Sequence, residues 1–196
     1  MTTTTSSNEA LIGVRIAVTG AGGGIGHAIC TELIARGADV IGLDLRGLDG
    51  LPEGVEGHVV DLTSLDSVAA LVGDLYRGDA RPVHLVNSAG IVEDDVAAED
   101  MPISQFDAVL GVNLRGVFIT CQAFGRELLA RGGGSIVNIA SMSGTAVVNF
   151  PQKQSAYNTS KAGVAALTRS LAVEWGPRGV RSTPYRRDTS THPSTP

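Results

Sequence analysis

A tyrosine and a lysine stand four residues apart in the run Y-N-T-S-K, which starts at Tyr157 and ends at Lys161. Residues at this spacing share one face of a helix. A free phenol has a pKa of about 10, and a nearby ammonium group favours its ionised form. The pair therefore has the chemistry of a general acid and base. Without other signals, such a pair is more often an ordinary helix surface.

A glycine-rich turn supplies a second chemical signal. The run T-G-A-G-G-G-I-G extends from Thr19 to Gly26, between an apolar segment and an amphipathic one. The N-terminus of a helix presents unpaired N–H groups that bind phosphate, and glycines allow a close approach. Gly20, Gly24 and Gly26 fit a dinucleotide cradle. A tight turn between strand and helix is the alternative interpretation.

Asp44 strengthens the dinucleotide interpretation. It ends the second apolar segment, near the distance from the glycines at which a carboxylate can bind the ribose hydroxyls. A carboxylate repels a 2′-phosphate, so NAD is favoured over NADP. Arg46 leaves NADP open, because it could reach such a phosphate. Asp44 could also be a solvated turn residue.

The rest of the chain alternates between expected strands and helices. The strands are expected at 14–18, 40–45, 57–60, 83–86 and 135–140, and the helices at 25–36, 64–76, 103–131 and 155–175. The strands are continuously apolar, which predicts that both faces of the sheet are covered. This order predicts an α/β fold with a doubly wound parallel sheet and right-handed crossovers.

Composition narrows the class of protein. The chain has 196 residues, 43% of them hydrophobic, and a formal net charge of -5. These values fit one soluble globular domain and disfavour a nucleic-acid surface. Cys30 and Cys121 lie in apolar patterns, so buried reduced thiols are expected. Residues 1–10 are expected to be a disordered tail, no apolar run looks long enough to cross a bilayer, and no metal site is expected. The cytoplasm is the default location.

With these motifs together, residues 11–181 resemble a short-chain dehydrogenase/reductase of the classical type, with a Rossmann-type dinucleotide-binding domain. The glycine turn matches the family's T-G-x-x-x-G-x-G, and N-S-A-G at 87–90 matches its N-N-A-G. The resemblance implies a catalytic tetrad of Asn113, Ser141, Tyr157 and Lys161. The cofactor-binding residues that it implies are Thr19, Gly20, Gly22, Gly24, Ile25, Gly26, Asp44, Asp61, Leu62, Asn87, Ala89 and Gly90, with Tyr157 and Lys161.

The resemblance implies an NAD(P)-dependent oxidoreductase that interconverts a secondary alcohol and a ketone. Tyr157 would exchange the alcohol proton while hydride moves to or from the nicotinamide. Ser141 would orient the reacting oxygen, and Lys161 would bind the nicotinamide ribose. Asn113 would hold a water that links Lys161 to solvent. A full-length relative would form a homotetramer or dimer through its long helices.

The segment between the serine and the tyrosine bears on the substrate. Ser141 and Ser143 both follow the fifth strand, and Ser141 is preferred because I-A-S matches the family's strand end. The long loop that follows is similar to loops of sugar and polyol dehydrogenases in the family. Asn149, Gln152 and Gln154 could bind substrate hydroxyls or could be exposed loop residues.

Residues 182–196 depart from the family pattern, because they are polar and rich in Pro and Thr. We expect an irregular tail there, without the last strands of the family fold. A shift of one base near the codon for Arg181 would permit Val-Asn-Ala-Val-Ser-Pro-Gly, which resembles the family, so a frameshift is a hypothesis. An open edge at the fifth strand and the absence of the family's substrate lid would make the chain poorly stable and weakly active or inactive. The alternative function is a catalytically impaired relative that only binds dinucleotide or acts as an interaction protein.

Overall fold

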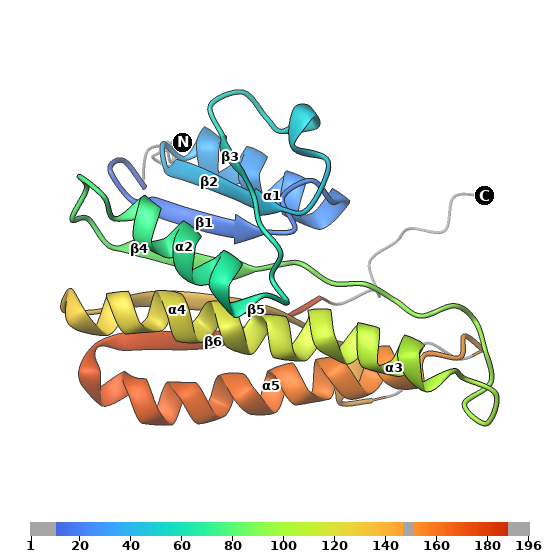
Figure 1. Cartoon of the computed structure of the whole chain (residues 1–196). Coiled ribbons are helices and arrows are strands. Elements are labelled where there is room, and N and C mark those ends of the chain that lie inside the picture. Colours follow the sequence, from blue (N-terminus) through green and yellow to red (C-terminus); the bar gives the residue numbers. More distant parts are fainter. Residues whose placement is uncertain (1–10, 147–150, 188–196) are drawn as a thin grey trace, which may run out of the picture.

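The structure is a computed structural model that describes residues 11–146 and 151–187 (Figure 1). The predicted N-terminal tail and Asn149 lie outside these residues. Six parallel strands form one sheet in the order β3-β2-β1-β4-β5-β6. They are β1 (Arg15–Thr19), β2 (Asp39–Asp44), β3 (Glu56–Val59), β4 (Val83–Asn87), β5 (Gly134–Ser141) and β6 (Val180–Arg187). The predicted doubly wound α/β sheet is confirmed.

Helices lie on both faces of this sheet (Figure 1). The helical elements are α1 (Gly24–Ala35), α2 (Leu65–Leu75), α3 (Ile103–Leu110), the π-helical turn η2 (Gly111–Gly116), α4 (Val117–Ala130) and α5 (Ser155–Trp175). Short 3-10 turns are η1 (Leu48–Gly50), η3 (Met142–Gly144) and η4 (Gly176–Arg178). Helix α1 packs on β1 and β2, whereas α4 and α5 pack on β4, β5 and β6.

Local sequence explains where these helices begin and end. The side chain of Ser64 accepts a hydrogen bond from the amide of Ser67 and so caps α2. Gly37 follows α1 with a φ of 82°, a conformation that favours glycine. The predicted ends of both helices therefore hold to within a residue or two.

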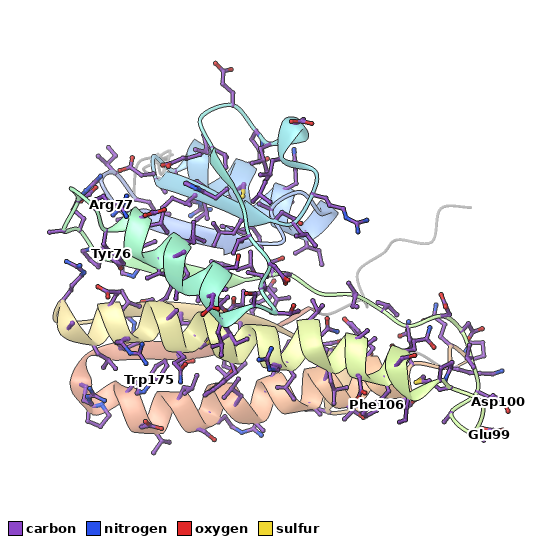
Figure 2. The ribbon with its side chains drawn as sticks, viewed as in Figure 1. Tyr76, Arg77, Glu99, Asp100, Phe106 and Trp175 are labelled. Atoms are coloured by element: carbon purple, nitrogen blue, oxygen red, sulfur yellow. The ribbon has the colours of Figure 1, made fainter. Side chains whose placement is uncertain are left out.

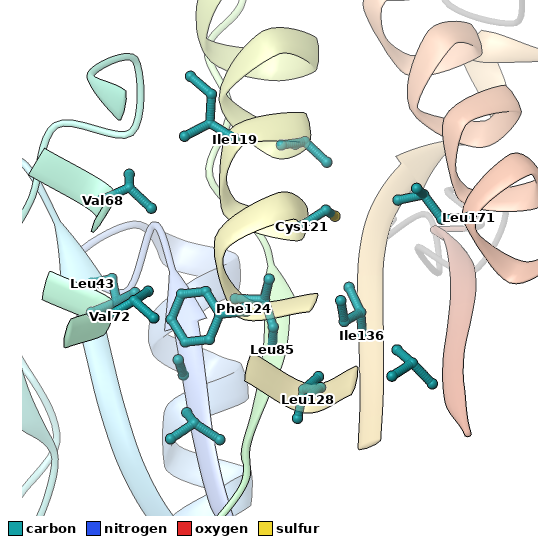
Figure 3. Packing of buried hydrophobic residues seen from close by; sticks show 14 of the residues in the cluster. Leu43, Val68, Val72, Leu85, Ile119, Cys121, Phe124, Leu128, Ile136 and Leu171 are labelled. Carbon is teal, nitrogen blue, oxygen red and sulfur yellow. The ribbon is translucent and has the colours of Figure 1, made fainter. Parts of the chain in front are cut away.

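The larger core lies between the sheet and α2, α4 and α5. Phe124 of α4 is fully buried and lies among Leu43, Val72 and Leu85, as Figure 3 shows. Cys121 belongs to the same core, and Cys30 to a smaller one under α1. Both thiols are free and buried, as predicted. Burial raises the pKa of Cys30 to about 11 and that of Cys121 to about 12.

One continuous helix runs through α3, η2 and α4, from Ile103 to Ala130. It is long and apolar enough to cross a membrane by length and composition, so the expectation that no segment reaches this length is wrong. Half of its most apolar window is buried inside the protein, where Phe124 and Leu128 are fully covered. These features are those of the core helix of a globular fold.

Strand β6 corrects the prediction of an irregular tail from residue 182. It pairs in parallel with the whole of β5, from Gly134 opposite Val180 to Ser141 opposite Arg187. Pairing uses backbone groups, so a polar sequence can complete an otherwise open edge. Pro184 is tolerated because β6 is itself the edge strand. The predicted open edge at β5 is therefore covered.

The prediction that both faces of the sheet are covered is correct only in part. On the α1 side, a groove of about 780 Å³ lies over β4, β5 and β6. Val86, Val137 and Ile139 line its floor, and Ile29 of α1 lines its wall. A second exception is β3, three of whose four residues are exposed at the other edge of the sheet. Apolar sequence alone did not reveal these open surfaces.

The end of the molecule that lies away from the glycine turn is held by Tyr76. Its hydroxyl accepts a hydrogen bond from the amide of Val83, and the guanidinium of Arg131 lies 4.0 Å from its ring centroid. Figure 2 shows Tyr76 at one end of the molecule and Phe106, with Glu99 and Asp100, at the other. These contacts tie α2, β4 and α4 together at the amino ends of the strands.

Candidate active site

A cleft opens at the carboxyl ends of the central strands β1 and β4. Between these two strands the strand order reverses, because β2 and β3 lie on one side of β1 while β4, β5 and β6 follow on the other. Its volume is about 370 Å³. Ligands of open α/β sheets bind at such a switch point. The predicted cofactor residues that line it are Gly20, Gly24, Ile25, Gly26, Asp44, Asp61, Leu62, Ala89 and Gly90.

The glycine turn is shaped for close approach. Gly20 has a φ of 70°, and a Cβ there would lie 2.7 Å from the Cα of Ala89. A Cβ on Gly26 would lie 2.0 Å from the carbonyl oxygen of Gly20. A Cβ on Gly24, by contrast, would meet no protein atom within 4 Å. The first two glycines are required by packing, whereas the third leaves room at the cleft.

The start of α1 is open to an anion. Its N-cap, Gly23, makes no side-chain capping bond, and no acidic residue lies in the first turn. The helix dipole and the free N–H groups of such an end favour phosphate. A dinucleotide pyrophosphate therefore fits the space in front of Gly24.

Five predicted cofactor residues are not among the lining residues of the cleft: Thr19, Gly22, Asn87, Tyr157 and Lys161. The first three are tied to neighbouring strands and turns by hydrogen bonds. The hydroxyl oxygen of Thr19 accepts hydrogen bonds from the amides of Ser88 and Ala89, at 3.0 and 3.1 Å. Asn87 donates to the side chain of Asn138 at 2.8 Å. The amide of Gly22 donates to the Asp44 carboxylate at 3.0 Å. These residues hold the wall in place.

Two carboxylates, those of Asp44 and Asp61, line the cleft. Asp44 accepts hydrogen bonds from Gly22 and from the amide of Leu45, at 3.0 and 2.7 Å. Asp61 accepts two bonds from Thr63, one from its hydroxyl and one from its amide. These bonds, led by that of the hydroxyl, lower the pKa of Asp61. Both oxygens of Asp44 are thus oriented by backbone amides next to the glycine turn.

Asn113 lies fully buried in the π-helical turn. Its amide group donates to the carbonyl of Ile91 and its oxygen accepts from the amide of Ile91, both at 2.8 Å. It also donates to the hydroxyl of Ser160 at 3.1 Å. Turns of this type often occur at functional sites. Asn113 therefore connects the cleft wall to α5.

Tyr157 and Lys161 come together as the helical spacing predicts. The ammonium nitrogen of Lys161 lies 5.7 Å from the ring centroid of Tyr157 and donates to the carbonyl of Ile139 at 2.8 Å. Only 4% of Lys161 is exposed. Burial lowers the pKa of Lys161 to about 8, because the charged form loses hydration.

Ser141 ends β5, two residues beyond the carbonyl that Lys161 contacts. Its hydroxyl oxygen accepts from the amide of Ser143 at 3.2 Å and caps the turn η3. A Cβ on Gly144 would lie 2.5 Å from the amide nitrogen of Ala162. The turn after Ser141 therefore packs directly on α5, close to Lys161. Both Ser141 and Ser143 are half-buried here.

Sequence reasoning missed three residues that support the site. Ser160 donates to the carbonyl of Tyr157 at 2.7 Å. Arg115 donates to the carbonyl of Thr63 at 2.6 Å and so holds the loop that carries Asp61. Glu93 binds the start of α5 through its carboxylate. Only Ser160 had a sequence signal, because it lies one turn from Tyr157.

Comparison with known proteins agrees with this arrangement. Residues 15–184 match the short chain dehydrogenase family, and the chain belongs to that family. It is 41% identical to a galactitol 2-dehydrogenase of Rhizobium johnstonii and 43% identical to an L-tagatose-forming galactitol 2-dehydrogenase of Cereibacter sphaeroides. Each match covers 87% of this chain and 69% of the relative.

Solved structures give the same result. A short-chain type dehydrogenase/reductase from Mycobacterium marinum is 34% identical, with a TM-score of 0.83 over 89% of this chain and 74% of that one. An NAD⁺-bound xylitol dehydrogenase is 31% identical, with a TM-score of 0.81 over 89% and 70%. The predicted family is confirmed, and the chain is an oxidoreductase that acts on alcohol and ketone groups. Its relatives extend beyond the region that it matches.

Proposed function

We propose that the chain is an NAD-dependent dehydrogenase that interconverts a polyol and the corresponding ketose. The observation that carries the proposal is the meeting of Tyr157 and Lys161 beside a cleft with a glycine-lined helix end. The relatives with sugar and polyol names, including a D-threitol dehydrogenase 38% identical to the chain, support the substrate class.

In this proposal, each residue of the site has a separate role in binding or catalysis. Gly24 and the start of α1 hold the pyrophosphate, and Asp61 with Leu62 faces the adenine. Ser141 orients the reacting oxygen, and Tyr157 takes its proton during oxidation and returns it during reduction. A nicotinamide cofactor bound in the cleft would supply the hydride chemistry. Lys161, next to the tyrosine ring, binds the nicotinamide ribose.

NAD is preferred to NADP because of the carboxylate of Asp44. It lies at the end of β2 and lines the cleft where the adenosine ribose would lie. Its negative charge favours ribose hydroxyls and repels a 2′-phosphate. Arg46 is exposed two residues later and is the group that could offset this preference.

A dinucleotide-binding protein without turnover is the second candidate. The open groove over β4, β5 and β6 favours it, because this groove leaves apolar strand residues uncovered. The presence of Asn113, Tyr157 and Lys161, held together beside the cleft, favours the first candidate, a dehydrogenase.

We also propose that the chain works in the cytoplasm as a homo-oligomer. A hollow of about 460 Å³ lies on the outer face of the long helix and α5. Leu110, Leu114 and Leu167 line it beside Phe118, which is 44% exposed. A hollow lined by half-buried leucines from two neighbouring helices, with one exposed phenylalanine beside it, suits a second copy of the chain.

The experiment is a substrate panel. Purified chain is mixed with NAD or NADP and with galactitol, threitol, xylitol or a simple secondary alcohol, and nicotinamide reduction is followed by absorbance. We expect turnover with NAD and at least one polyol, and less with the simple alcohol. Dinucleotide binding without any turnover would support the second candidate.

A further inference from the structure

Glu93 contacts the first turn of α5 from a distant part of the sequence. It lies in the segment between β4 and α3, more than sixty residues before α5. One carboxylate oxygen accepts from the amides of Ala156 and Tyr157, at 2.8 and 3.1 Å. The other accepts from the amide of Tyr157 at 3.0 Å. Both oxygens thus meet the backbone of the tyrosine.

The location of this carboxylate is costly unless it is well bonded. Glu93 is only 7% exposed, whereas its neighbours Asp94 and Asp95 are exposed. A buried charge needs partners, and the amides of a helix start supply them together with a favourable dipole. The N-cap residue of α5, Gln154, makes no side-chain capping bond. Glu93 therefore takes the role of the cap from outside the helix.

The backbone of Tyr157 is held on its other side as well. Its carbonyl accepts from the hydroxyl of Ser160, which accepts from Asn113. Asn113 in turn makes both of its bonds with the backbone of Ile91, two residues before Glu93. The contacts form a closed ring that joins the cleft wall to the backbone of Tyr157.

We propose that Glu93 is a positioning residue for Tyr157, which fixes the phenol relative to the wall of the dinucleotide cleft. Its catalytic consequence rests on the proposed function, but its structural consequence does not. Loss of the carboxylate would release the N-terminal turn of α5 while the buried part of the helix stays packed. A displacement of about 1 Å can reduce turnover about a hundredfold.

Three variants separate this role from a general effect on folding. Glu93→Leu removes both acceptors. Glu93→Gln keeps one carbonyl oxygen for the amides of Ala156 and Tyr157, so it should rescue part of the effect. Asp95→Asn is the matched control. Asp95 lies in the same segment as Glu93 and accepts a hydrogen bond from the amide of Lys153, just before α5, but none from Tyr157.

The first readout is amide hydrogen exchange, which needs no activity. In Glu93→Leu, exchange at Ala156 and Tyr157 should be at least tenfold faster, while the buried Val164 of the same helix changes less than twofold. The second readout is tyrosine-labelled NMR, since the chain has three tyrosines. The ring signal that Tyr157→Phe removes should move in Glu93→Leu, less in Glu93→Gln, and not in Asp95→Asn.

The third readout is turnover. We expect kcat to fall at least tenfold in Glu93→Leu, with the KM for NAD changed less than threefold. Equal acceleration of exchange at Val164 and Tyr157, or an unmoved ring signal, would overturn the proposal. If Glu93→Leu does not fold, the same three measurements on Glu93→Gln test the proposal. A wild-type chain without turnover would refute the proposed function. Amide exchange and the ring signal need no activity, so they would still test whether Glu93 positions Tyr157.

Discussion

The ammonium nitrogen of Lys161 lies 5.7 Å from the centroid of the Tyr157 ring, and the same nitrogen donates to the carbonyl of Ile139 at 2.8 Å. One lysine thereby ties helix α5 to strand β5, two residues before Ser141. The contact also places a buried positive charge next to a phenol. Both consequences can be measured.

Lys161 should make stability depend on pH in a defined direction. Burial lowers the pKa of Lys161 from 10.5 to about 8, so between these values the unfolded chain binds more protons at this side chain than the folded chain. The wild-type chain should gain stability relative to Lys161→Met as pH rises from about 8 to 10.5. The gain should be lost as pH falls through about 8, and its full size is about 3 kcal/mol.

The measurement is urea unfolding of both chains at a series of pH values from neutral to alkaline. The difference between wild type and Lys161→Met cancels the titration of the buried thiols and of Tyr76, which both chains share. A difference that stays constant across this range would show that Lys161 titrates as it does in the unfolded chain.

Gly24 and Gly26 form a matched pair of sites for alanine. Gly26→Ala should destabilise the fold by about 3 kcal/mol, because its Cβ would lie 2.0 Å from a backbone oxygen. Gly24→Ala should change stability by less than about 1 kcal/mol, because its Cβ meets no protein atom within 4 Å. Thermal unfolding of the two variants checks this order.

The same pair tests where the dinucleotide binds. Gly24→Ala should lower the affinity for NADH at least tenfold, because the new methyl group would occupy the space in front of the helix start. Titration calorimetry measures the affinity. Unchanged binding in Gly24→Ala would place the pyrophosphate elsewhere.

Asp44 should set the preference between NAD and NADP. Asp44→Asn keeps an oxygen for the amide of Gly22 but removes the negative charge, so affinity for NADPH should rise about tenfold while that for NADH falls only a few-fold. Asp49→Asn, at an exposed site in the turn η1, controls for net charge. An equal response of both cofactors in Asp44→Asn would refute this role.

The frameshift near Arg181 stays a hypothesis that DNA can test. We expect the codons for residues 181–192 to permit Val-Asn-Ala-Val-Ser-Pro-Gly in the shifted frame. Fresh genomic sequence that excludes this reading would end the hypothesis. The strand β6 shows that the polar sequence can still pair with β5 up to Arg187.

The sequence was sufficient for the parts of the fold that local chemistry decides. The five expected strands and the end of α1 at Gly37 followed from apolar runs and glycine. Tyr157 and Lys161 could be placed together because a helix fixes their spacing. The prediction of an irregular tail from residue 182 was wrong, because β6 pairs with the edge of β5 through backbone groups and this pairing needs no apolar pattern.

Residues that act across long sequence distances could not be found in this way. Glu93 reads as one of several acidic residues in a loop, and only the fold brings it to the amide of Tyr157. Arg115 likewise reaches the carbonyl of Thr63 only in three dimensions. Thr19 and Asn87 were expected at the cofactor, but hydrogen bonds within the wall define their positions.

The most direct test compares wild-type chain with Tyr157→Phe in NAD-dependent oxidation of a polyol. We predict that both chains bind NADH with affinities within threefold, and that turnover falls by a factor of at least a hundred in Tyr157→Phe, the usual size of an acid/base contribution. Turnover that survives the loss of the phenol, or wild-type chain that binds NADH but oxidises no polyol, would contradict the assignment of Tyr157 as the acid/base of a polyol dehydrogenase.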